Sequence, residues 1–272
     1  MRRIWLCADD YAISPAVDVA IRDLLARGRL NATSVMVVAP SFAPEVPPLA
    51  ALRAERRVAI GLHLTLTEPF RPLTAFHPLR GGAFPPLAAM AQLAFLRRLD
   101  RAAIAAEIEA QLNTFTAAFG RAPDFVDGHQ HVHLFPQIRD EMLAGVKRAT
   151  PAAWVRQCGS ALPLRMLLRD FKTLALSELS RGFRRRAAAF GLRTNPAFAG
   201  VYALDPDTDF AALFPRFLEG LSEAGLVMCH PGHVDLELRR LDPLTDLRET
   251  EYEYFAGEAF PRALAAAGVA LV

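Results

Sequence analysis

The sequence IWLCADDYAISP (residues 4–15) joins an apolar run to an acidic pair and then to a helix start. Ile4 to Ala8 is short and wholly apolar, which is typical of a buried strand. Ser14 can cap a helix with its side chain and Pro15 suits the first helical turn, so we predict a helix that ends near Gly28. The stretch therefore predicts a strand, an acidic loop and a helix.

The same unit recurs along the chain. Apolar residues have strong helical spacing at 100–119, and helices are also indicated at 48–56 and after Pro136. Between these helices lie short apolar or β-branched runs, which we expect to be strands: 33–39, 58–66, 125–129, 154–156, 201–204, 226–229 and 269–272. The repetition predicts an α/β fold with a parallel sheet. Over this length it favours a (β/α) barrel, irregular or incomplete, over an open sheet.

Length and composition indicate the number of domains, the partners and the compartment to expect. The chain has 272 residues, 52% of them hydrophobic, so we expect a single domain over residues 1–272. Lys and Arg number 31 against 29 Asp and Glu, which gives no reason to expect nucleic acid as a partner. Three widely spaced cysteines favour a reducing compartment. No apolar run approaches the ~20 residues of a transmembrane helix, and we expect a cytoplasmic protein.

Two segments stand apart from the alternating pattern. Residues 67–99 are rich in Pro, Gly and Phe with weak periodicity, and such long connections are usually functional, so we expect them to contact substrate. Residues 164–186 repeat apolar side chains every three or four positions and carry arginines beside them. This pattern predicts a surface helix with a solvated face; a helix that binds a membrane surface or a partner is the alternative.

Six of the seven histidines fall in three short clusters beside predicted strand ends. The clusters are Gly61-Leu62-His63, Asp127-Gly128-His129-Gln130-His131-Val132-His133, and Cys229-His230-Pro231-Gly232-His233-Val234-Asp235. Parallel α/β folds keep their chemistry at the carboxyl ends of strands. Imidazoles and carboxylates gathered there are typical of a metal-dependent hydrolase.

The adjacent carboxylates of Asp9 and Asp10 point to different sides if the strand stays extended. One could then ligate a cation while the other acts as a base; a solvated turn into the helix is the alternative. His63, in an apolar run, is either a core histidine or a ligand. Arg156, at another strand end, is either a substrate contact or a surface ion-pair partner.

The three histidines of the second cluster occupy alternate positions. In a strand, His129, His131 and His133 would lie on one face about 6.6 Å apart. One ion cannot take all three, so at least one is expected to support a ligand or face substrate, with Asp127 as a natural supporting partner.

The third cluster offers an acid. His230 ends an apolar strand at a sharp turn, and a histidine there can serve as a general acid. Asp235 is close enough in sequence to orient it.

Together these residues resemble the YdjC-like family of metal-dependent carbohydrate deacetylases. The resemblance runs in order through Ala8 to Tyr11, Gly61 to Leu64, Asp127 to Pro136, and Cys229 to Asp235. It implies a barrel similar to that of polysaccharide deacetylases and hydrolysis of an N-acetyl group on a sugar. It also implies roles for single residues: Asp10, His63 and His129 as metal ligands, Asp9 as base and His230 as acid.

The resemblance implies one divalent ion, magnesium or zinc. Two histidines and one aspartate suit zinc or another transition ion better than magnesium. The chain departs from the family pattern with Tyr11-Ala12 in place of Phe-Gly, and with Gln130 in place of a frequent His. Because alanine disfavours a positive φ, we expect the loop over the metal to differ.

Three functions follow, in order of preference. The first is a metal-dependent hydrolase that removes an N-acetyl group from an amino sugar, short glycan or glycolipid. The second is another metal-dependent amidohydrolase or a phosphoesterase, as the His-x-His pattern suggests. The third is a non-catalytic sugar-binding protein. The sequence names neither the acetylated substrate nor the metal, and it leaves a homo-oligomer open.

Overall fold

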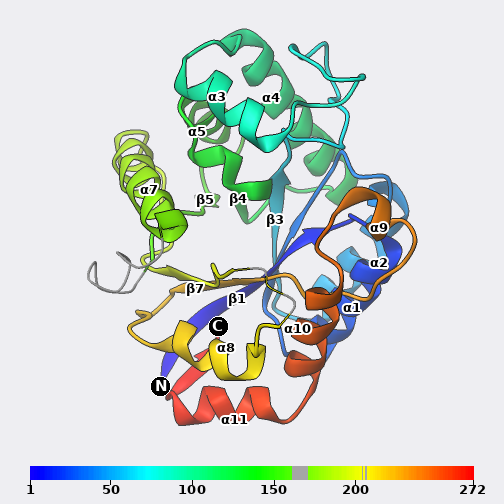
Figure 1. The fold of residues 1–272 in the computed structure, drawn as a ribbon, viewed down its shortest axis with the longest axis vertical. Coiled ribbons are helices and arrows are strands. Elements are labelled where there is room, and N and C mark those ends of the chain that lie inside the picture. The colour runs from blue at the N-terminus through cyan, green and yellow to red at the C-terminus, as the bar shows by residue number, and fades with distance from the viewer. Residues whose placement is uncertain (161–170, 204, 206) are drawn as a thin grey trace.

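Eight parallel strands form a curved sheet wrapped by helices in the computed structural model, which describes residues 1–160, 171–203, 205 and 207–272 (Figure 1). The strands run β5-β4-β3-β2-β1-β7-β6, and β8 pairs with the start of β1. They are β1 (Arg2–Tyr11), β2 (Ala32–Val35), β3 (Ala59–Leu64), β4 (Phe125–Gly128), β5 (Trp154–Val155), β6 (Phe198–Ala199), β7 (Leu226–Cys229) and β8 (Val269–Leu271).

The sheet forms an incomplete barrel. Its two end strands, β5 and β6, have two residues each. Between these ends, among the described residues, isolated parallel bridges join Val155 to Thr194 and Ser160 to Phe198 in place of a continuous ladder. The predicted α/β fold with an irregular or incomplete barrel is confirmed.

Helices cover the outside of the sheet. Figure 1 shows α4 and α5 together on one side, and α1, α2 and α10 on the other. The helices are α1 (Pro15–Ala26), α2 (Phe42–Glu55), α3 (Leu87–Phe95), α4 (Arg101–Phe119), α5 (Ile138–Ala149), α7 (Phe171–Ala189), α8 (Phe210–Leu218), α9 (Leu238–Leu241), α10 (Asp246–Ala256) and α11 (Ala259–Ala266).

Two helices, one of them with its cap predicted at Ser14, begin at side chains that cap their first turn. Ser14 Oγ accepts a hydrogen bond from the Val17 amide, with Pro15 as the first residue of α1. Asp100 caps α4 through the amides of Ala102 and Ala103. These local signals are strong because a side-chain oxygen satisfies backbone donors that the helix itself leaves free.

Several predicted strands are shorter or displaced. The run at 33–39 leaves the sheet after Val35, and residues 201–203 are not a strand; the strand nearest to them is β6. Residues 67–99 include the helix α3, so they are not wholly irregular. The ends of a strand are hard to predict from an apolar run, because buried loops beside the mouth of a barrel are apolar as well.

The basic segment 164–186 lies partly outside the described residues, which resume at 171. From there α7 buries Ser180, Phe183 and Ala187 while Arg184 and Arg185 are exposed. This one-sided burial matches the predicted surface helix with a solvated face. Within the described part of the chain, no helix has both the length and the apolar character to span a bilayer.

Candidate metal centre

The polar side chains predicted at strand ends converge at the carboxyl edge of the sheet. Asp9 and Asp10 lie near the end of β1, and His63 lies near the end of β3. In the parallel register His63 stands beside Asp127 of β4. His230 directly follows β7, which pairs with β1 on its other side. Parallel strands thus bring residues more than 200 positions apart to one edge.

Asp10, His63 and His129 form a compact, buried cluster. Asp10 Oδ1 lies 3.2 Å from His63 Nε2 and 2.9 Å from His129 Nδ1. One ligand atom from each residue lies within 4.8 Å of the others, a spacing that can hold a metal ion. Two imidazole nitrogens and one carboxylate form a donor set that suits zinc or another transition ion.

Asp127 orients one of these histidines. Its Oδ1 lies 2.7 Å from His63 Nδ1, and Ser34 Oγ lies 3.0 Å from the same nitrogen. The opposite ring nitrogen, Nε2, is thereby turned toward Asp10. Burial alone would lower the pKa of His63, but the charges of Asp127 and Asp9 outweigh burial and raise it to about 10. A bound metal therefore has to displace a proton from this ring.

Asp9 forms a bidentate ion pair with Arg156. Arg156 Nη1 donates to Asp9 Oδ2 at 2.6 Å, and Nη2 donates to Oδ1 at 2.7 Å. Burial alone would raise the pKa of Asp9, but the charges of Arg156 and His63 and the hydrogen bonds from Arg156 together hold the pKa well below its usual range. The two adjacent aspartates therefore have different surroundings, although the strand is not extended at Asp10, whose φ is 66°.

Arg156 is fully buried, so it is not a surface ion-pair partner. Besides Asp9 it contacts Asp127 Oδ2 at 2.5 Å and Cys7 Sγ at 3.0 Å. Cys7, Asp9 and Asp127 also lie close enough together to suggest a second metal site. The guanidinium already occupies the space among them, and its positive charge disfavours a cation there.

A second buried arginine, Arg248 of α10, holds the other oxygen of Asp10. Its Nη2 donates to Asp10 Oδ2 at 2.7 Å and to Asp242 Oδ2 at 2.8 Å. Burial would raise the pKa of Asp10, but His129 and Arg248 lower it well below its usual range. Arg248 was not predicted, because nothing in the sequence around an arginine in a polar helix indicates a contact with a residue 238 positions away.

The backbone beside the metal ligands is left-handed. Asp10 has φ 66° and Ala12 has φ 79°, so the loop takes the conformation that glycine favours without having a glycine. The Ala12 amide donates to Asp18 Oδ1 at 2.6 Å, which ties the loop to α1. Ala12 thus adopts the positive φ that alanine disfavours, and the buried contact with Asp18 helps to hold it.

The histidines after β4 are not in a strand, so the prediction that they lie on one strand face is wrong. The strand ends at Gly128, and Gln130 and His131 turn the chain with φ 52° and 59° within the short helix η1 (His129–Leu134). His131 Nδ1 lies 3.6 Å from Cys158 Sγ, and His133 Nε2 lies 2.9 Å from the Arg156 carbonyl oxygen. Neither belongs to the ligand cluster, and His133 contacts the backbone of Arg156, which directly follows β5.

His230 is positioned by Glu251, not by Asp235 as predicted. The His230 amide donates to Glu251 Oε2 at 2.6 Å, and Tyr202 donates to the other carboxylate oxygen at 2.6 Å. Asp235 instead accepts from the amides of Ala16 and Leu238. Closeness in sequence misled because the turn after β7 carries Asp235 onto other backbone donors. His230 Nδ1 is buried without a hydrogen-bond partner among the described residues.

The aromatic segment 67–99 reaches the cluster through Phe70. Phe70 is buried, and its ring meets the His129 ring edge to face with centroids 5.9 Å apart. The peptide before it, Glu68-Pro69, is cis. The segment therefore forms part of the wall around the candidate ligands, where it can exclude water.

Comparisons with known proteins place this geometry among carbohydrate-active relatives. A family model described as YdjC-like protein matches residues 3–266. Chitooligosaccharide deacetylases of Yersinia pestis (strain Pestoides F) and Yersinia pseudotuberculosis (serotype O:1b) are each 29% identical over 236 residues, which is 85% of this chain and 82% of theirs.

Solved structures share the fold. A protein of Enterococcus faecalis V583, named for cellobiose-phosphate cleavage, aligns with a TM-score of 0.76 and 22% identity over 100% of this chain and 97% of its own. A peptidoglycan N-acetylglucosamine deacetylase aligns with a TM-score of 0.50 and 12% identity over 99% and 85%. At these identities the likeness concerns the fold alone, and it agrees with the incomplete barrel.

Proposed function

The chain belongs to the YdjC-like protein family, and on that premise we propose that it is a metal-dependent carbohydrate deacetylase. Its substrate would be an N-acetylated amino sugar, short glycan or glycolipid, in keeping with the relatives named chitooligosaccharide deacetylases. The observation that carries the proposal is the buried Asp10, His63 and His129 cluster beside the Asp9 and Arg156 pair.

Asp10, His63 and His129 would hold one divalent ion. When bound, such an ion polarises the acetyl carbonyl and lowers the pKa of a water, so that a weak base can deprotonate it. Asp127 and Arg248 would keep two of the ligands in place, through His63 Nδ1 and Asp10 Oδ2 respectively. Outer partners of this kind commonly change metal affinity 10- to 100-fold when they are removed.

Asp9 would take the proton from the attacking water. Both its oxygens already accept from Arg156, and Oδ1 also accepts from Ser34 Oγ at 3.3 Å, but Oδ2 has a further lone pair. Arg156 keeps Asp9 ionised at neutral pH and fixes its plane. Such an acidic carboxylate is a weak base, so it can serve only where the water is already acidified.

His230 would give a proton to the departing amine. Its backbone is anchored by Glu251, and its Nδ1 is left without a partner among the described groups. His230 also acts on Asp9, whose pKa it lowers by less than Arg156 does, so the two side chains belong to one site. A base and an acid at the same edge of the sheet as the ligand cluster fit hydrolysis of an amide.

The test combines metal content with product. Elemental analysis of the purified protein should find about one divalent ion per chain. Chelation should abolish acetate release from N-acetylglucosamine oligomers until zinc or another divalent ion is restored. Full activity in a verified metal-free preparation would sink the metal role. Phosphate release from phosphoesters without acetate release would favour the phosphoesterase alternative, and sugar binding without either product would favour the binding protein.

A further inference from the structure

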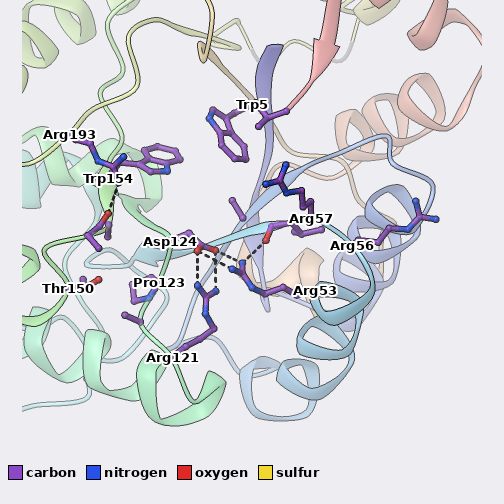
Figure 2. A pocket seen from close by; sticks show the side chains of 16 residues that line it. Trp5, Arg53, Arg56, Arg57, Arg121, Pro123, Asp124, Thr150, Trp154 and Arg193 are labelled. Atoms are coloured by element: carbon purple, nitrogen blue, oxygen red, sulfur yellow. Dashed lines mark hydrogen bonds and ion pairs between the residues drawn. The ribbon is translucent and has the colours of Figure 1, made fainter.

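A cavity of about 640 Å³ lies at the end of the barrel opposite the metal centre (Figure 2). It is lined at the amino ends of the strands: Trp154 begins β5, Val58 precedes β3, and Asp124 precedes β4. Asp9 and Asp10 lie at the far end of β1, which contributes Trp5 near its start. The cavity is therefore separate from the proposed catalytic site.

Charge in this cavity is strongly one-sided. Five arginines line it, with Asp124 as the only acidic side chain among the lining residues described. Arg53 and Arg121 both clamp Asp124, Arg121 through Nη2 at 2.8 Å, and the Ile60 amide donates to it at 2.8 Å. Asp124 is thus fully engaged, and the two clamped guanidiniums keep a surplus positive charge in fixed positions.

Two further arginines have no acidic partner. Figure 2 shows Arg57 and Arg193 on either side of the indole rings, while Arg56 is directed away from the other lining residues. Among the described residues no carboxylate lies within ion-pair distance of Arg57 or Arg193; Arg193 Nη2 donates to the Ala152 carbonyl oxygen at 2.8 Å. Unpaired guanidiniums beside a cavity attract anions, and their fork geometry matches phosphate oxygens.

The cavity also offers an apolar wall for a ring. Trp5 and Trp154 have ring centroids 6.3 Å apart with 35° between their planes. Trp154 is held by stacking on Phe125 at 4.4 Å, so its position is fixed before any ligand arrives. Both indoles are half-buried, which leaves part of each ring free to pack against a ligand.

We propose that this cavity binds a small phosphate ester whose ring packs on the indoles of Trp5 and Trp154 and whose phosphate is held by one of the two arginines that flank them, Arg57 or Arg193. A nucleotide and a sugar phosphate share this chemistry. The inference does not rest on the proposed deacetylase activity, since none of these residues lies at the metal centre.

Tryptophan fluorescence provides a selective test. Trp5 and Trp154 are the only two tryptophans in the chain, so the signal reports on this cavity and not on the metal centre. We would titrate the full chain with AMP, glucose 6-phosphate and inorganic phosphate at constant ionic strength. We expect a saturable change with at least one ester, at concentrations about tenfold below those needed for inorganic phosphate, because ring packing adds to the anion contact.

A double variant, Arg57→Gln with Arg193→Gln, should weaken ester binding at least tenfold, since each charge-assisted contact contributes about that factor. The matched control is Arg98→Gln with Arg240→Gln, which removes the same charge from two exposed sites away from the cavity and should bind like wild type. No saturable change with either ester, inorganic phosphate that binds as tightly, or equal weakening in the control pair would overturn the proposal. Acetate release by the double variant without ester should be unchanged.

Discussion

At the scale of single residues, Asp9 and Asp10 show how two adjacent carboxylates can have entirely different partners. Asp10 faces two imidazoles through Oδ1 and Arg248 through Oδ2, whereas both oxygens of Asp9 face Arg156. The change of direction is helped by the left-handed φ of Asp10. Two neighbouring carboxylates that were equally exposed to solvent would compete for one cation. Here each carboxylate has its own buried partners.

The two aspartates should respond differently to the same substitution. Asp9→Asn should keep about one metal ion per chain and lose turnover by roughly 10²- to 10⁴-fold, as expected for a lost general base. Asp10→Asn should lose the ion itself, because it removes a charged ligand. Metal analysis and acetate assays on both variants decide the roles. Normal metal content in Asp10→Asn would show that it is no ligand, and an empty site in Asp9→Asn alone would reverse the assignment.

His230 can be tested through the leaving group. An amine must be protonated to leave a tetrahedral intermediate, whereas a nitrophenolate leaves unaided. His230→Ala should therefore slow N-acetyl hydrolysis by about 10²- to 10⁴-fold yet spare much of any metal-dependent activity on a nitrophenyl acetate ester. Similar losses on both substrates, at unchanged metal content, would assign His230 to another step.

At the scale of elements, α10 completes a site whose other parts come from strand ends. It supplies Arg248 to the candidate ligand Asp10 and Glu251 to the backbone of His230. The helix packs against α1, which starts just after the acidic pair. A displacement of α10 would therefore disturb ligand and acid together.

Removal of the arginine on α10 should show this dependence. Arg248→Met keeps the side-chain bulk but leaves Asp10 Oδ2 and Asp242 without their cation, and loss of one buried partner typically costs about 3–5 kcal/mol of folding stability. We also expect zinc affinity to fall by roughly 10- to 100-fold. Urea unfolding in chelator and zinc titration measure the two effects. Arg240→Met, at an exposed position of α9, should change stability by no more than about 0.5 kcal/mol; if both variants behave alike, Arg248 does not position Asp10.

At the scale of the whole molecule, the two ends of the barrel gather different types of charged side chain. Carboxylates and imidazoles gather at the carboxyl end, and arginines line the cavity at the amino end.

The titration of the buried groups is linked to folding, because a pKa that differs between folded and unfolded chains makes stability depend on pH.

His63 should make the metal-free protein less stable as pH rises. Its folded pKa of about 10 lies above the value of 6.5 for an exposed histidine, so its stabilising contribution is complete below pH 6.5 and is lost as pH rises through 10. In chelator, the stability difference between wild type and His63→Gln should therefore shrink between pH 6.5 and 10. A constant or growing difference would contradict the assigned charge network.

His133 provides the matched control for this pH series. Burial lowers its pKa to about 4, so its effect on stability has the opposite sign and belongs to a different window. Its neutral form is favoured by folding above pH 6.5, and that stability is lost as pH falls from 6.5 through 4. The difference between wild type and His133→Gln should therefore stay flat between pH 6.5 and 10.

The sequence by itself determined the elements that depend on local interactions. The cap at Ser14, the helical spacing of 100–119 and the apolar strand 226–229 were all predicted within a residue or two, since backbone satisfaction and amphipathic spacing act over one or two turns. Polar residues at strand ends also predicted a metal centre at the carboxyl edge that parallel strands share, whereas the choice of Asp10, His63 and His129 as its ligands came from the resemblance to the YdjC-like family.

The tertiary structure alone decided what those residues touch. Arg156 pairs with Asp9 across 147 positions and Arg248 pairs with Asp10 across 238, distances over which no periodicity in the chain carries information. The turn at Gln130 and His131 broke the expected strand through two positive φ angles that their side chains do not announce. Likewise a chain with a formal net charge of only +2 gathers five arginines at one cavity, because folding places side chains by contact and not by composition.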